Sequence, residues 1–108
     1  MKILIAGLGA IGSLLAAYLF EKHDVYCVGR SWHIDVIKER GYLLLKIPSE
    51  NVERKIYLRH LSTSFQDFSN MEFDFIFITV KAYDLEEVLK EIVDNSCLLY
   101  TSDAADDG

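Results

Sequence analysis

The opening of the chain is the feature that most constrains its fold. An apolar, strand-like pattern at residues 3–6 runs directly into G-L-G-A-I-G at residues 7–12, and a helical pattern of apolar residues follows at once. In such a segment the first glycine permits a tight turn, the second allows another group to approach the backbone, and the third allows close helix–strand packing. The segment therefore predicts the first strand–turn–helix unit of an α/β fold.

The same turn predicts a binding site for a dinucleotide. The helix behind the glycines presents free N–H groups and a partial positive charge, both of which suit a pyrophosphate. The residues expected to hold it are Gly7, Leu8, Gly9, Ala10, Ile11 and Gly12. Because glycines also mark ordinary turns, a purely structural turn is the alternative.

Size and composition favour one small cytoplasmic domain. The chain has 108 residues, of which 51% are hydrophobic, enough for a packed α/β core. We expect no membrane association and no secretion, since no apolar run could cross a bilayer and no signal-peptide pattern precedes the first strand. A net charge of −6 without a basic stripe argues against nucleic acid as a partner. Cys27 and Cys97 lack metal-site spacing, so we expect no metal.

Apolar spacing predicts the elements of the first half. The first helix should end near residues 22–23, and a buried strand with Cys27 should cover 25–28. Gly41 should end a second helix whose stripe contains Trp32, Val36 and Ile37. Residues 42–47 and 52–58 flank a turn and predict an antiparallel hairpin at the sheet edge or beside it. The expected apolar face of the first helix is Ile11, Leu14, Leu15, Tyr18 and Leu19.

The second half contains one further strong strand and one helix. Residues 61–70 are polar and irregular, with one helical turn near 65–68, and His60 before them has no evident partner. The nearly continuous apolar run at 73–80 is typical of a parallel strand covered on both faces, so we expect a central strand. Asp84 should cap a third helix. The predicted apolar face of that helix is Leu85, Val88, Leu89, Ile92 and Val93. The fold class is thus a Rossmann-like parallel sheet with helices on both faces and an antiparallel edge hairpin.

Arg30 indicates which dinucleotide is bound. NAD-binding domains usually place an acid at the end of the second strand, where it holds the ribose 2′-hydroxyl. Here the acid, Asp24, precedes the strand, and Gly29 and Arg30 follow it. A guanidinium can bind a 2′-phosphate through two charge-assisted hydrogen bonds. Ser31, as the expected N-cap of the second helix, could share that phosphate, so NADP is favoured over NAD. A surface charge on a turn is the alternative for Arg30.

Val80 and Lys81 complete the candidate site. They end the apolar run, and ligands in open α/β sheets bind beyond the carboxyl ends of the strands. Lys81 is therefore expected near the cofactor and the active site, although an ordinary surface lysine has the same appearance.

With the glycine turn, Arg30, the hairpin and T-V-K-A-Y at 79–83 in place, residues 1–95 resemble the N-terminal domain of ketopantoate reductase. The resemblance implies an NADPH-dependent oxidoreductase that converts 2-dehydropantoate to pantoate for pantothenate biosynthesis. It implies that Arg30 binds the 2′-phosphate and that Lys81 lies beside the nicotinamide half of the cofactor. A second, helical domain would supply most contacts to the keto acid substrate and the lysine that acts as general acid, so residues 1–96 are expected to be inactive alone.

The end of the chain departs from the family pattern. The family has an asparagine, usually in an Asn-Gly pair, where this chain has Thr101-Ser102-Asp103. Residues 97–107 instead resemble translated read-through of a sequencing adapter, so we interpret 97–108 as a non-native tail on a truncated enzyme. A fifth strand at 97–100 followed by an acidic loop is the alternative.

Two other functions remain open at this point. One is a regulatory nucleotide-sensing Rossmann module, although such modules generally keep an acid where Arg30 stands. The other is a reductase of a different 2-keto acid.

Overall fold

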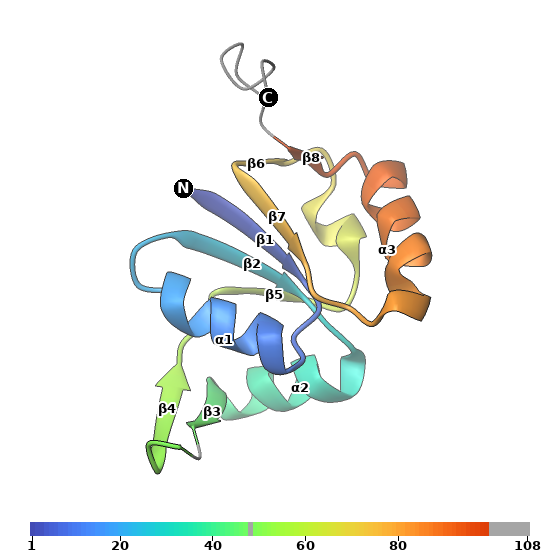
Figure 1. The fold of residues 1–108 in the computed structure, drawn as a ribbon. Coiled ribbons are helices and arrows are strands. Elements are labelled where there is room, and N and C mark those ends of the chain that lie inside the picture. Colours follow the sequence, from blue (N-terminus) through green and yellow to red (C-terminus); the bar gives the residue numbers. More distant parts are fainter. Residues whose placement is uncertain (48, 100–108) are drawn as a thin grey trace.

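The fold is known from a computed structural model that describes residues 1–47 and 49–99. Four parallel strands form the main sheet in the order β5-β2-β1-β7. They are β1 (Lys2–Ala6), β2 (Asp24–Val28), β5 (His60–Ser62) and β7 (Phe75–Ile78). The helices are α1 (Ala10–Leu19), α2 (Ser31–Arg40) and α3 (Ala82–Asp94), with a 3-10 helix, η1, at Phe65–Phe68. Helices lie on both faces of the sheet (Figure 1), so the Rossmann-like class is confirmed.

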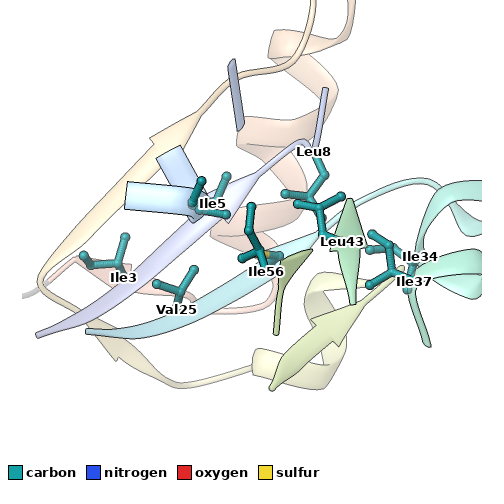
Figure 2. Close-up of a cluster of buried hydrophobic side chains, with 11 residues drawn as sticks. Ile3, Ile5, Leu8, Val25, Ile34, Ile37, Leu43 and Ile56 are labelled. Atoms are coloured by element: carbon teal, nitrogen blue, oxygen red, sulfur yellow. The ribbon is translucent and has the colours of Figure 1, made fainter. Parts of the chain in front are cut away.

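Side-chain alternation along β1 divides the interior into two cores. Ile3 and Ile5 face α1, α2 and the hairpin, whereas Leu4 and Ala6 face η1 and α3. The first core is rich in aliphatic residues from both central strands (Figure 2). The second contains Tyr26 with Phe68 and Phe73 packed edge-on against its ring. Both faces of the sheet are thus covered by this chain, as a parallel sheet requires.

The hairpin is confirmed and lies beside the main sheet. Strands β3 (Leu43–Ile47) and β4 (Val52–Ile56) pair antiparallel in a two-stranded sheet of their own. Leu43 and Ile56 are buried in the first core, which attaches the hairpin to the sheet by packing. Gly41 ends α2 with a φ of 94°, as predicted.

Two expectations for strands are wrong. Residues 60–62 form β5, which pairs in parallel with β2, and the His60 ring stacks on Tyr26 with centroids 4.0 Å apart. The run predicted as a central strand is divided into β6 (Glu72–Phe73) and β7, and β7 is an edge strand of the four-stranded sheet. The short β6 pairs in parallel with β8 (Leu98–Leu99), so a strand does begin in the segment interpreted as a tail. Residues 100–108 lie outside the described part.

The predicted face of α1 is also wrong in part. Small residues, Gly12, Ser13, Ala16 and Ala17, are the ones buried against the sheet. Leu15 and Leu19 pack at the border of the core, while Ile11 is 67% and Tyr18 71% exposed. On α2, Ile34 and Ile37 are buried and Trp32 and Val36 are exposed. Small residues face the sheet because the glycine turn brings α1 close to it.

Candidate nucleotide-binding site

The glycine turn is held tightly between β1, β2 and β7. The N–H of Gly7 donates to the carbonyl oxygen of Val28 at 2.8 Å, and the φ of Gly7 is 107°. The hydroxyl of Thr79, at the end of β7, donates to the carbonyl oxygen of Gly7, also at 2.8 Å. A Cβ atom on Gly12 would overlap that same carbonyl oxygen and lie 2.8 Å from Thr79 Oγ1. Gly7 and Gly12 are therefore required by the chain's own packing.

Gly9 differs from Gly7 and Gly12, because a Cβ atom added at Gly9 would point into open space. No atom lies within 4 Å of the position that a Cβ atom would occupy there. Gly9 is the N-cap of α1, makes no side-chain cap hydrogen bond, and the first turn of α1 contains no acidic residue. The first N–H groups of a helix have no partner within the helix. The open space beside Gly9 and the free N–H groups at the start of α1 together form a cradle. This cradle fits an anionic group such as a pyrophosphate, which would occupy the space beside Gly9.

The turn opens into a crevice of about 670 Å³ at the carboxyl ends of the strands. Of the ten predicted residues, eight line it and two do not: Gly12 is buried in the turn, and Ser31 lies outside the lining. The predicted residues that line it are Gly7, Leu8, Gly9, Ala10, Ile11, Arg30 and Lys81, together with Val80. The structure thus brings together the segments after β1, β2 and β7, which are distant in sequence.

The prediction that Ser31 caps α2 is wrong. The N-cap is Arg30, in extended backbone conformation, and Ser31 is the first residue of the helix. The carbonyl oxygen of Arg30 accepts from the N–H groups of His33 and Ile34. No side chain of the N-cap is hydrogen bonded to the helix end. The Arg30 side chain lines the crevice instead.

Arg30 links the start of α2 to α3. Its Nη2 atom donates to Oδ2 of Asp84 at 3.1 Å; the side chains are 68% and 25% exposed, respectively. The prediction that Asp84 caps α3 is therefore wrong. The N-cap is Lys81, and Asp84 lies in the first turn with its carboxylate directed to Arg30.

Sequence reasoning missed the acidic wall of the crevice. Asp84, Glu87 and Glu91 of α3 all line it. Their spacing of three and four residues places them on one helix face, and that spacing was visible in the sequence. At the start of α2, the Trp32 ring stacks on His33 with centroids 5.3 Å apart, and both residues line the crevice. Partial burial, together with nearby Arg40, lowers the pKa of His33.

The described ranges contain neither a metal-binding cluster nor a membrane-spanning helix. Residues 1–47 and 49–99 contain no group of three or more His, Cys, Asp or Glu side chains placed to hold a metal ion. Within the same ranges, no helix has the length and apolar character needed to span a membrane.

Comparison with known proteins gives consistent matches along the described chain. The family model "Ketopantoate reductase PanE/ApbA" matches residues 3–96. A 2-dehydropantoate 2-reductase of Pyrococcus horikoshii is 33% identical over 103 residues, which cover 92% of this chain and 32% of the relative. This chain therefore spans about a third of the length of that curated relative.

Solved structures agree on the fold. A 2-dehydropantoate 2-reductase from Porphyromonas gingivalis W83 aligns with a TM-score of 0.73 at 22% identity, covering 94% of this chain and 35% of that one. A ternary structure of D-mandelate dehydrogenase with NADH and anilino(oxo)acetate aligns with a TM-score of 0.67 at 27% identity, covering 98% and 35%. In both cases the matched part is about a third of a longer chain.

Proposed function

The chain belongs to the ketopantoate reductase PanE/ApbA family, and from this premise we propose that it is the cofactor-binding part of an NADPH-dependent 2-dehydropantoate 2-reductase. The observation that carries the proposal is the cradle beside Gly9. There an uncapped helix N-terminus meets open space at the head of a large crevice. Family membership favours the reductase over a regulatory nucleotide-sensing module.

Different segments of the chain would bind different parts of the cofactor. The backbone of residues 7–12 would hold the pyrophosphate through the N–H groups at the start of α1. Arg30 would bind the 2′-phosphate of the adenosine half. Lys81, with Val80, would lie beside the nicotinamide half and the substrate. When bound, the nicotinamide supplies the hydride that reduces a ketone.

The preference for NADP rests on charge at the end of β2. Arg30 lies at the N-terminus of α2 and lines the crevice, so a phosphate there would meet both the guanidinium and the positive end of the helix. An NAD-specific site would place a carboxylate at this position.

We assign residues 1–96 to the cofactor-binding domain and propose that 97–108 is not native to it. The remaining two thirds of a relative's length would supply the helical domain, the substrate contacts and the general acid. The proposed enzyme is cytoplasmic and acts on a small keto acid.

Titration of the chain with each cofactor tests the cofactor half of the proposal. NADPH should bind with a lower Kd than NADH, and Arg30→Ala should remove most of that difference while leaving NADH binding nearly unchanged. Lys38→Ala, which removes an exposed positive charge at the far end of α2, is the matched control. Equal affinities for the two cofactors in the unsubstituted chain would contradict the assignment of NADP.

A reductase of a different 2-keto acid is the second candidate. Its support is the likeness to a D-mandelate dehydrogenase whose structure holds NADH and an oxo acid analogue. Because substrate contacts would come from the remaining domain, assays of the full-length protein with a panel of 2-keto acids separate the two candidates. The same cofactor site serves both.

A further inference from the structure

The Arg30 guanidinium already has a partner in the crevice, because one of its N–H groups donates a hydrogen bond to Asp84. Nη2 of Arg30 and Oδ2 of Asp84 are 3.1 Å apart, and the two residues come from segments more than fifty positions apart. Both line the crevice with the glycine turn. We propose that Asp84 competes with the cofactor's 2′-phosphate for Arg30 and so reduces the preference for NADPH over NADH. This inference rests on the proposed function.

Two negative groups, the Asp84 carboxylate and the 2′-phosphate, would meet at one guanidinium in the NADPH complex. A 2′-phosphate bound to Arg30 would bring its negative charge close to the Asp84 carboxylate, and like charges at such distances repel. NADPH must therefore displace Asp84 from Arg30 or tolerate the repulsion. NADH carries only a hydroxyl at that position, so it meets neither cost. A carboxylate beside the ribose can accept a hydrogen bond from that hydroxyl.

The surroundings of Asp84 strengthen the effect. Asp84 is only 25% exposed, so water screens it less than a fully exposed surface acid. Glu87 and Glu91 line the crevice on the same face of α3 and add negative charge to that wall. Within the described residues, Arg30 is the only group that forms an ion pair with Asp84. Removing the carboxylate would leave Arg30 fully available to phosphate.

The experiment compares Kd values for NADPH, NADH and adenosine 2′,5′-bisphosphate in the chain and in Asp84→Asn. We expect NADPH and the bisphosphate to bind about tenfold more tightly to Asp84→Asn, the order of change typical of relieving one close like-charge contact. NADH should bind equally well or more weakly. Glu86→Gln is the matched control, since it removes one exposed charge from α3 outside the crevice.

The double variant Arg30→Ala/Asp84→Asn separates competition from general repulsion. If Asp84 acts through Arg30, the gain for NADPH should be mostly lost when Arg30 is absent. A gain that persists in full without Arg30 would overturn the proposed competition. Weaker NADPH binding by Asp84→Asn would also overturn it, because Asp84 would then be positioning Arg30 for the phosphate.

The outcomes distinguish this inference from the proposed function. If the chain binds neither dinucleotide nor the bisphosphate while its circular dichroism shows a folded α/β protein, the proposed function fails and the inference fails with it. If the chain binds dinucleotides but Asp84→Asn and Glu86→Gln leave the same ratio of affinities, only the inference is overturned.

Discussion

Gly9 and Gly12 are three residues apart in one turn, and a methyl group would have opposite consequences at each. At Gly12 it would overlap the carbonyl oxygen of Gly7, whereas at Gly9 it would meet nothing within 4 Å. Gly12→Ala should lower the free energy of unfolding by about 3 kcal/mol, the upper end of the range typical of overpacked sites. Gly9→Ala should change it by less than about 1 kcal/mol. Urea denaturation of both variants measures the difference.

The same pair tests the cradle by cofactor binding. Gly9→Ala should weaken NADPH binding at least about tenfold, because its methyl group fills the space assigned to the pyrophosphate. Gly9→Ala would then lower the affinity for NADPH while leaving the free energy of unfolding nearly unchanged. Unchanged affinity in a folded Gly9→Ala protein would place the pyrophosphate elsewhere.

Cys27 gives a prediction for alkaline pH. The thiol is fully buried in β2, and burial raises its pKa from 9.0 to about 12. In the unfolded chain the thiol ionises from about pH 9, so the unfolded state loses its proton first and stability should fall as pH rises from about 9 towards 12. Thermal unfolding as a function of pH should show this loss, and Cys27→Ala should lose less over the same interval. Identical slopes for the two proteins would contradict the burial argument.

At the scale of elements, α2 ends where Gly41 adopts a left-handed conformation. Its φ is 94°, and no atom lies within 4 Å of an added Cβ, so a substitution there would be opposed by backbone strain alone. Gly41→Ala should cost about 1–2 kcal/mol of unfolding free energy. Gly41→Asn should retain more stability because asparagine tolerates this conformation better. Melting temperatures of the two variants provide the comparison, and equal values would remove strain as the cause.

Helix α1 shows why an apolar pattern can indicate the wrong face. Its apolar residues surround the helix, so the bulky ones and the small ones both fit a helical spacing. In the structure the small residues face the sheet, because Gly12, Ala16 and Ala17 permit the close approach of α1 to the sheet that the turn imposes. Ile11 and Tyr18 were left on the surface. Strand β7 carries a similar ambiguity, because an apolar composition does not say whether the strand has one neighbour or two.

At the scale of the whole molecule, the crevice joins segments that are far apart in the sequence. The crevice is lined by the glycine turn, the start of α2 and the wall of α3. Large apolar side chains, among them Ile11, Trp32 and Tyr83, are exposed around it. A reductase needs substrate contacts and a proton donor in addition to a cofactor, and we propose that these lie outside residues 1–96.

We therefore expect the 108-residue chain to bind NADPH without oxidising it in the presence of 2-dehydropantoate. The measurement is the NADPH absorbance of a mixture of chain, cofactor and keto acid, with the 2-dehydropantoate 2-reductase of Pyrococcus horikoshii as the positive control. Sustained loss of absorbance above the rate without protein would show that these residues contain a complete active site.

Local patterns determined those parts of the protein that depend on neighbouring residues. The strand–glycine–helix order predicted the turn, Gly41 predicted the end of α2, and alternation predicted the hairpin. Each of these features is encoded within a few positions, where backbone geometry and side-chain periodicity act directly. Arg30 and Lys81 were likewise placed near the crevice by the general rule for strand ends.

Only the tertiary structure decided which distant side chains meet. The pairing of Arg30 with Asp84, the stacking of His60 on Tyr26 and the edge position of β7 all join segments that are far apart in the sequence. Such contacts depend on how the elements pack together, and no local pattern encodes that packing. Ser31 and Asp84 looked like helix caps in the sequence, whereas in the fold Arg30 and Lys81 are the N-caps. The Asp84 carboxylate binds Arg30, a contact between distant segments.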